Sequence, residues 1–220
     1  HASYRRQRQM CIRDSPKLVQ CHLDDIEQAW EAIKIAKDSR IHVFTSTSEI
    51  HMEHMLRKTK EDILKDTRES VKYAKKLCQD VEFSAQDATR TDKEFLIEVL
   101  KTAVEEGATT INVPDTVGYA TPKDYLDLLQ SVYEDVKGGN EDVIISTHCH
   151  NDLGLAVANS LTAITAGARQ IEGAINGIGE RAGNTSTEEI IMAIKTRQDQ
   201  FGVDIKACLL YTSDAADDRM

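Results

Sequence analysis

Six short runs of β-branched and apolar residues, each followed by a longer amphipathic stretch, constrain this fold more than any other feature. The runs cover residues 18–21, 41–44, 81–83, 111–113, 143–146 and 171–175. The amphipathic stretches space their apolar residues three and four apart, as helices do. The last four runs begin about 30 residues apart, the length of one β/α unit. Strands joined by helices run parallel, so the sequence predicts an α/β fold.

Residues at the ends of the amphipathic stretches support this division. Hydroxyl side chains precede three of the stretches, where an N-cap is expected, and a proline occupies the first helical position of one of them. Glycines follow four of the stretches, where a helix is expected to stop. The predicted N-caps are Thr91, Thr121 and Ser186, and the predicted stops are Gly107, Gly138, Gly167 and Gly202.

Six units suit either a doubly wound open sheet or a (β/α)₈ TIM barrel with two units missing. A nucleotide-binding doubly wound sheet has a glycine-rich turn after its first strand, but residues 21–24 read CHLD. In a barrel, polar residues gather where the strands end. They do so here at residues 45–48, 84–87, 114–116, 148–152 and 176 onward. We therefore predict an incomplete (β/α)₈ barrel with about six of its eight units.

Charge and hydropathy exclude several classes of protein. The chain has 27 Lys and Arg against 37 Asp and Glu, a net charge of −10, which would repel a phosphate backbone. No run approaches the roughly 18 apolar residues of a membrane span, and the first residues do not resemble a secretory signal. We expect no nucleic-acid partner, no membrane partner and a cytoplasmic location. Cys21, Cys78 and Cys149, with no CxxC motif, suit a reducing compartment.

The two ends of the chain lack the alternating strand-like and amphipathic runs of the residues that lie between them. Residues 5–15 are basic and aperiodic, and residues 208–218 follow a stretch that already reads as a finished helix. The strings MCIRDS and CLLYT are translations of opposite strands of one DNA adapter sequence. We therefore expect residues 1–15 and 208–220 to be adapter-derived, and residues 16–207 to form a partial catalytic barrel domain.

Two histidines directly after the fifth run form a candidate metal clip. Strand alternation sends His148 and His150 to one face, about 6 to 7 Å apart along the backbone. Two imidazoles at this spacing can converge on one cation, although two hydrogen-bonded histidines at a barrel rim would show the same spacing. The next unit adds NGIGERAGN at 176–184, a charged loop whose glycines allow close approach of a small anion.

These two motifs carry a family resemblance. THCHNDLGLAVANS (147–160) followed by IEGAINGIGERAGN (171–184) resembles the catalytic barrel of the α-isopropylmalate synthases, which belong to a larger group with the homocitrate and citramalate synthases and hydroxymethylglutaryl-CoA lyase. Residues 40–51, 81–92 and 109–122 match in the same order. The resemblance implies an acyltransferase that condenses acetyl-CoA with 2-oxoisovalerate to give 2-isopropylmalate, in leucine biosynthesis.

Other members of the group remain alternatives. A citramalate synthase would use pyruvate, a homocitrate synthase would use 2-oxoglutarate, and an aldol-type lyase would share the metal site. The lyase is disfavoured because its catalytic cysteine loop is not found in this sequence. A non-catalytic α/β binding module is disfavoured by the paired motifs.

The resemblance also implies roles for individual residues. His148, His150 and Asn184 are implied as metal ligands, and Thr116 as a hydrogen-bond partner of the oxo acid. Mixed nitrogen and oxygen ligands favour Mn²⁺ or Mg²⁺, while two histidines would also accept Zn²⁺ or Co²⁺. His42 is a further catalytic candidate that equally suits a polar core position.

Two departures from the family pattern bear on catalysis. Gln86, another catalytic candidate, stands where the family has Glu in an FSxED motif, and an amide cannot act as a base at neutral pH. The family's DTTLRDGE-type first-strand motif, with a metal-binding aspartate, and its C-terminal regulatory region are not found in this sequence. We expect the chain alone to be inactive and only marginally stable, and its parent enzyme to be a homodimer.

Overall fold

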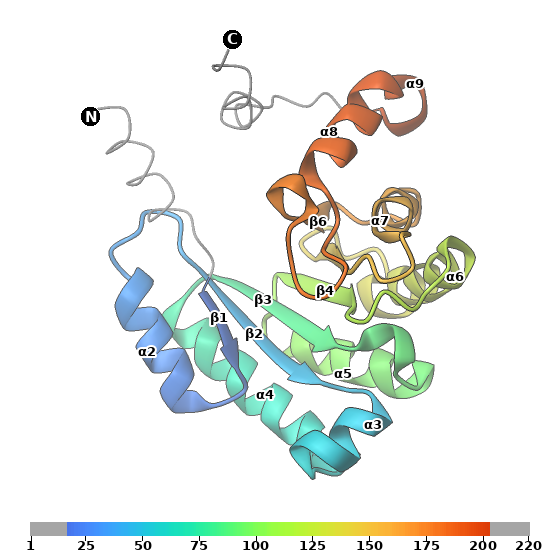
Figure 1. Ribbon diagram of the computed structural model, residues 1–220. Helices are drawn as coiled ribbons and strands as arrows, with labels where there is room; N and C mark the ends of the chain where they lie inside the picture. Colours follow the sequence, from blue (N-terminus) through green and yellow to red (C-terminus); the bar gives the residue numbers. More distant parts are fainter. Residues whose placement is uncertain (1–16, 203–220) are drawn as a thin grey trace.

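The computed structural model describes residues 17–202, which form a parallel sheet of six strands in strictly sequential order (Figure 1). The strands are β1 (Lys17–Gln20), β2 (Arg40–Ser46), β3 (Asp80–Gln86), β4 (Thr110–Asp115), β5 (Ile144–Cys149) and β6 (Gln170–Glu172). A doubly wound sheet reverses its strand order at a switch point. The sequential order therefore confirms the predicted incomplete barrel. Both proposed adapter segments, 1–15 and 208–220, lie outside the described residues.

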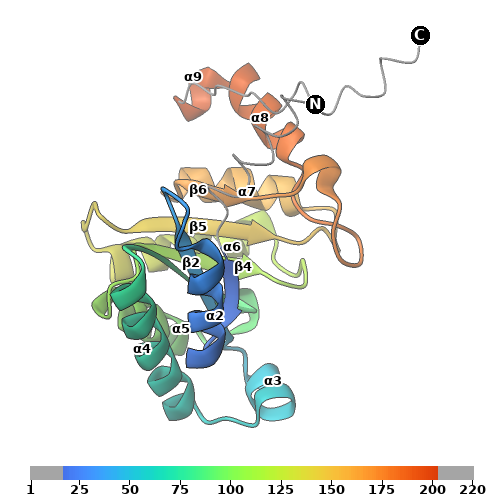
Figure 2. The ribbon, with the colours of Figure 1, turned by 90° about the vertical axis from the view of Figure 1, so that its left-hand side faces the viewer.

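Helices connect the strands and cover the outer side of the curved sheet (Figures 1 and 2). The main connecting helices are α2 (Leu23–Ile33), α4 (Lys60–Leu77), α5 (Lys93–Glu105), α6 (Pro122–Val132), α7 (Ala156–Thr165) and α8 (Thr187–Thr196). Shorter pieces are α3 (Glu49–His51), η1 (Met52–Leu56), η2 (Ala88–Arg90), η3 (Tyr133–Lys137), η4 (Ile175–Gly177) and α9 (Gln198–Phe201). Each long helix follows one strand, as the spacing of the runs predicts.

Alternation along each strand separates an apolar outer side from a polar inner side. Ile41, Val43 and Phe83 are fully buried in the hydrophobic core with the helices. The residues between them, such as His42 and Glu82, are also buried but belong to the opposite face, because successive side chains of a strand point to opposite sides. The interior of the partial barrel is therefore polar, and this is where chemistry can be placed.

Some predicted boundaries need correction. The sixth strand was expected over residues 171–175, but β6 ends at Glu172, and Asn176 adopts a left-handed conformation with φ of 59° in the short η4 turn. Thr91 was expected to cap α5. Asp92 caps it instead, accepting a hydrogen bond from the Phe95 backbone N–H, because the Thr91 hydroxyl donates to the carbonyl of Asp87. The Thr121 and Ser186 caps are confirmed.

Helix α4 is the longest helix in the described part of the chain, at 18 residues. Its buried residues include Ile63, Val71 and Ala74, spaced along one face, while charged residues occupy the rest. Within residues 17–202, no helix combines the length and apolar character needed to cross a membrane.

Candidate metal and substrate site

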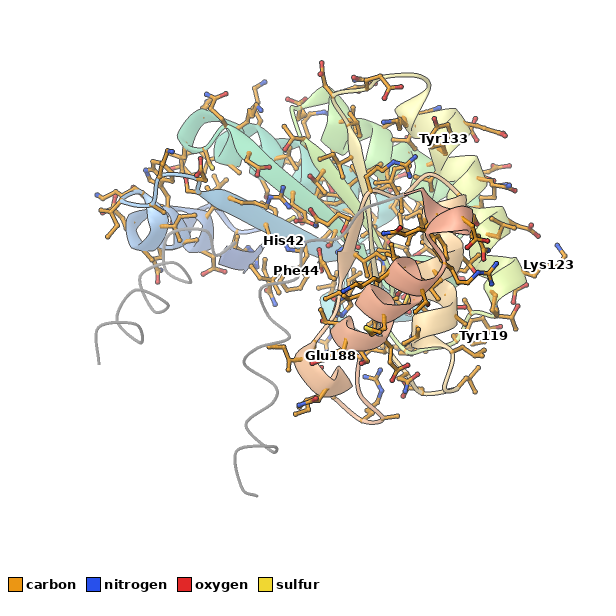
Figure 3. All side chains as sticks on the ribbon, turned by 90° about the horizontal axis from the view of Figure 1, so that it is seen from above. His42, Phe44, Tyr119, Lys123, Tyr133 and Glu188 are labelled. Carbon is orange, nitrogen blue, oxygen red and sulfur yellow. The ribbon has the colours of Figure 1, made fainter. Side chains whose placement is uncertain are left out.

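A cavity of about 420 Å³ lies on the inner side of the sheet, and the six residues singled out from the sequence all line it. They are His42, Gln86, Thr116, His148, His150 and Asn184. Its wall also includes the apolar side chains of Leu18, Phe44 and Pro114 and the carboxylates of Glu172 and Glu180. His42 and Phe44 both come from β2 and lie close together in Figure 3. Residues from all six described strands and their loops therefore meet at one place.

The two histidines at the end of β5 face each other across a short gap. Their Nε2 atoms lie 3.2 Å apart, and their ring centroids are 5.0 Å apart at an angle of 70°. Asn184 pairs with His150 through an isolated backbone bridge, which brings the β6 loop alongside the end of β5. The Asn184 side-chain amide donates to the carbonyl of Ile178 at 3.4 Å, so its oxygen is turned the other way.

These three side chains fit a divalent cation. Oδ1 of Asn184 is buried without a hydrogen-bond partner within the described residues, and the two histidines turn their Nε2 atoms toward each other. Buried polar atoms without partners are uncommon in folded proteins. The 3.2 Å between the two Nε2 atoms suits two ligands that each lie about 2.1 Å from one ion. Imidazole nitrogens with an amide oxygen form a donor set that binds first-row divalent metals or Mg²⁺.

The electrostatics of the cavity also favour a cation. Glu172 and Glu180 are among its lining residues, and within the described part of the chain no Lys or Arg lines it. Burial, followed by the neighbouring His148 and Arg181, lowers the pKa of His150. A neutral imidazole keeps a free lone pair, which metal ligation requires. A small anionic substrate would therefore have no positively charged partner in the described lining of this cavity unless a cation were bound there.

Thr116 is held so that its hydroxyl proton remains available. Its Oγ1 accepts a hydrogen bond from the Asp87 backbone N–H at 2.9 Å, leaving the O–H free to donate to a ligand. Its carbonyl accepts from Arg181 at 2.8 Å, and the same guanidinium makes two hydrogen bonds with Asp152, at 2.7 and 2.8 Å. Arg181 thus ties together the loops that follow β4, β5 and β6.

Gln86, the last residue of β3, presents a donor to the cavity. Its Oε1 accepts from the Ser46 hydroxyl at 2.5 Å, and no described residue accepts a hydrogen bond from its Nε2. A glutamate at this position would offer an oxygen acceptor and a negative charge instead. The exchange of Glu for Gln therefore changes both the charge and the hydrogen-bonding character of this part of the wall.

His42 is at once a cavity residue and a hydrogen-bonded core residue. Its Nε2 lies 2.6 Å from the Ser84 hydroxyl, and the residue is 8% exposed. Burial lowers its pKa to about 4, although the nearby Glu172 carboxylate acts in the opposite direction. His42 is therefore neutral at physiological pH.

A buried polar cluster under the cavity was not predicted. We call it the floor network: Arg40, Glu82, Ser146, Gln170 and Glu172. The Arg40 guanidinium donates to Glu82 at 2.9 Å and to the Gln170 side-chain oxygen at 2.6 Å, which connects β2 with β6 across the interior. The Gln170 amide donates to Glu82 at 3.0 Å. Two-residue alternation places Arg40 on the same strand face as His42 and Glu82 on the same face as Gln86, but it does not show that these faces meet across the interior.

The two carboxyl groups of the floor network differ in acidity. Burial and then the neighbouring Glu172 raise the pKa of Glu82. Burial opposes ionisation of Glu172 as well, but the neighbouring His148 and Glu82 side chains lower its pKa. Ligand atoms of His42, Glu82 and Glu172 lie within 4.8 Å of one another, a grouping that could hold an ion. Arg40 already neutralises Glu82 there, so His148, His150 and Asn184 form the better cation site.

The acidity of His42 predicts a measurable pH dependence of stability. Unfolded His42 binds a proton near pH 6.5, whereas the buried side chain resists protonation until about pH 4. Between these values the unfolded state holds more protons, so the free energy of unfolding falls as the pH falls. We expect a loss of about 3 kcal/mol from this group between pH 7 and 4. Urea unfolding of wild type and His42→Gln at several pH values measures it; parallel profiles for the two proteins would contradict the assignment.

Sequence comparison places the chain among known proteins. The model of the HMGL-like family matches residues 7–214. A protein from Clostridium kluyveri named 2-isopropylmalate synthase is 56% identical over 184 residues, which cover 84% of this chain and 36% of that protein. A protein of the same name from Methylacidiphilum infernorum is 55% identical over 186 residues, covering 84% and 37%. The chain spans about a third of the length of these curated relatives.

Solved structures share the fold at low sequence identity. Hydroxymethylglutaryl-CoA lyase from Pseudomonas aeruginosa is 19% identical with a TM-score of 0.72, over 87% of this chain and 65% of that chain. An HMG-CoA lyase from Acinetobacter baumannii, solved with coenzyme A and 3-methylmalate, is 19% identical with a TM-score of 0.69, over 92% and 73%. The extent of the family match, together with the sequential barrel topology, shows that this chain belongs to the HMGL-like family.

Proposed function

We propose that this chain carries the metal and 2-oxo acid site of a 2-isopropylmalate synthase, which condenses acetyl-CoA with 2-oxoisovalerate. Relatives of that name, 51 to 56% identical to it, support the proposal. The observation that carries it is the cavity, where His148, His150 and Asn184 meet beside an apolar wall and where no described Lys or Arg is present to bind an anion.

The chain's own residues would bind and orient the oxo acid. A divalent cation, Mn²⁺ or Mg²⁺ in our proposal, would be held by His148, His150 and Asn184 and would polarise the substrate's carbonyl as a Lewis acid. The Thr116 hydroxyl would donate to the oxo acid. A carbon–carbon bond would then form between the methyl carbon of acetyl-CoA, after loss of a proton, and the carbonyl carbon, whose oxygen would take up a proton and become the hydroxyl group of the product. Hydrolysis of the thioester releases the free thiol of CoA. Gln86 cannot remove the methyl proton, because an amide is not a base at neutral pH.

The apolar wall favours a branched aliphatic side chain on the oxo acid. Leu18, Phe44 and Pro114 offer carbon surface to an isopropyl group. The second carboxylate of 2-oxoglutarate would be desolvated against this wall without a cationic partner among the described lining residues. The methyl group of pyruvate would leave part of the wall uncovered. The cavity therefore favours 2-oxoisovalerate over the substrates of homocitrate and citramalate synthases.

Further elements of the proposal concern partners and location. One structural neighbour was solved in complex with coenzyme A and 3-methylmalate, which supports acetyl-CoA as the second substrate. We also propose that the complete enzyme is a cytoplasmic homodimer, following the family resemblance.

A chimeric enzyme tests the proposed function. The 184 matched residues of the Clostridium kluyveri relative are replaced by those of this chain, and thiol release from acetyl-CoA is measured with 2-oxoisovalerate, pyruvate and 2-oxoglutarate. We expect activity that is lost with EDTA, restored by Mn²⁺ or Mg²⁺, and highest with 2-oxoisovalerate. The unmodified relative is the control. A clear preference for pyruvate or 2-oxoglutarate would overturn the substrate assignment.

Gln86→Glu in this chimera tests the departure from the family pattern. We expect turnover to rise about 100-fold, the lower range of what a positioned acid or base contributes, because a carboxylate would replace a neutral amide in the wall. Gln86→Ala, which removes the polar group, is expected to lower turnover below that of the starting chimera. Equal turnover with Gln and Glu would mean that an amide suffices at this position.

A further inference from the structure

Glu172 lies beside one of the proposed metal ligands for a simple topological reason. In the parallel pairing of β5 with β6, His148 is the direct register partner of Glu172. Directly paired residues on adjacent strands point to the same side of the sheet. The Glu172 Oε2 atom consequently lies 3.5 Å from Nδ1 of His148, a ring nitrogen that no described residue hydrogen-bonds.

The other oxygen of Glu172 is held by the floor network. Its Oε1 accepts from the Gln170 amide and from the Ser146 hydroxyl, each at 3.3 Å. Gln170 is fixed in turn by Arg40 and Glu82. The carboxylate is thus anchored from below through one oxygen, which leaves the second oxygen directed at the imidazole.

We infer that Glu172 is a positioning residue, which holds His148 in the tautomer with the proton on Nδ1 so that Nε2 presents its lone pair to the cation. The inference rests on the proposed metal-ligating role of His148. Its Nε2 lies 3.2 Å from Nε2 of His150, and this contact is favourable only when one of the two nitrogens is an acceptor. An acceptor Nε2 on His148 requires the proton on Nδ1, facing Glu172.

The two histidines therefore differ in how they are prepared for a ligand. Glu172 lies 3.5 Å from Nδ1 of His148, whereas no ion pair joins His150 to a carboxylate of the described residues. A carboxylate that accepts the second ring proton of a ligating histidine fixes the ring orientation and raises its basicity. His148 is the preorganised ligand of the pair, and His150 adjusts to it.

The tautomer of His148 in the metal-free 220-residue chain tests the inference directly. Long-range ¹H–¹⁵N spectra of the imidazole groups, assigned with a His148→Gln variant, distinguish the two neutral forms. We expect the Nδ1–H form in wild type and in Glu172→Gln, which keeps an acceptor oxygen. In Glu172→Ala we expect a shift towards the Nε2–H form. Wild-type His148 in the Nε2–H form would overturn the inference whether or not any variant folds.

Metal affinity supplies a second readout. In the chimera described above, Mn²⁺ binding followed by electron paramagnetic resonance should weaken about 10- to 100-fold in Glu172→Ala, the usual effect of losing such a partner. Glu172→Gln should recover most of this loss. Glu82→Gln, which keeps an acceptor for the Gln170 amide and makes no contact with His148, should weaken Mn²⁺ binding less than Glu172→Ala. Equal losses in Glu172→Gln and Glu172→Ala, or in Glu82→Gln, would show that charge rather than orientation matters.

The two proposals can fail separately. If wild type binds no Mn²⁺ while His148 has the Nδ1–H form that depends on Glu172, the positioning role stands and the metal assignment fails. If Mn²⁺ binds normally in Glu172→Ala and the tautomer is unchanged, the positioning role fails and the metal site stands.

Discussion

His148→Ala and His150→Ala, separately, are expected to weaken Mn²⁺ binding by at least 100-fold and to reduce thiol release by the chimera to background. Each substitution removes one of two nitrogens that lie 3.2 Å apart in the cavity, and the remaining imidazole cannot hold the ion without its neighbour. Mn²⁺ affinity is measured by electron paramagnetic resonance, and turnover by release of the CoA thiol.

Two controls separate ligation from folding in this experiment. His54→Ala removes a histidine whose side chain is 70% exposed, away from the cavity, and should leave both measurements unchanged. Circular dichroism and urea unfolding of the two cavity variants should resemble those of wild type, because His148 and His150 lie at the cavity wall. If either cavity variant keeps wild-type affinity for Mn²⁺, that histidine is not a ligand.

Arg40→Ala is expected to have the largest effect on stability, lowering the free energy of unfolding by about 3 to 5 kcal/mol at pH 9, where Glu82 is ionised. Glu82 is 1% exposed and is paired with Arg40 at 2.9 Å, so removal of the guanidinium leaves a buried carboxylate without its partner. The raised pKa of Glu82 has a further consequence. As the pH falls through about 8, Glu82 takes up a proton and no longer needs a positive partner, so the defect should shrink towards pH 6. Urea unfolding at pH 6 and pH 9 measures this change.

The double variant Arg40→Ala with Glu82→Gln identifies the source of that defect. It should recover much of the lost stability at pH 9, because no buried charge remains. Lys123→Ala, which breaks an exposed pair with Asp127, should change stability little. A defect that is independent of pH and is not relieved by Glu82→Gln would mean that Arg40 acts through packing alone.

The sequence predicted the fold because its signals are local. β-branched runs, amphipathic spacing and glycine stops repeat about every 30 residues, and sequential parallel units leave few alternative arrangements. The prediction made the sixth strand too long because Ile171 and Ile175 both favour a strand. The sequence does not reveal that Asn176 takes a left-handed conformation in a turn there. The prediction that Thr91 caps α5 was wrong because its hydroxyl donates to the Asp87 carbonyl, a contact that the sequence pattern does not show.

The cavity was only partly predictable for the same reason. His148, His150 and Asn184 lie in recognisable motifs, and the structure brings them to one cavity with His42, Gln86 and Thr116. Arg40 and Gln170 lie 130 positions apart in the chain, and their contact exists only because the sheet curves. Patterns within single strands cannot show that curvature, so the residues under the cavity escaped the sequence analysis.

The sequential strand order has a consequence for how this site comes into being during synthesis. Each described strand pairs only with described strands that are its neighbours in the chain, so each emerging β/α unit can dock on the edge left by the one before. The wall with His42 and Gln86 can therefore assemble before β5 has been made, whereas the histidine pair and Asn184 arrive with the last two described units. Acquisition of a metal ion by a nascent chain would accordingly mark the completion of β5 and the β6 loop.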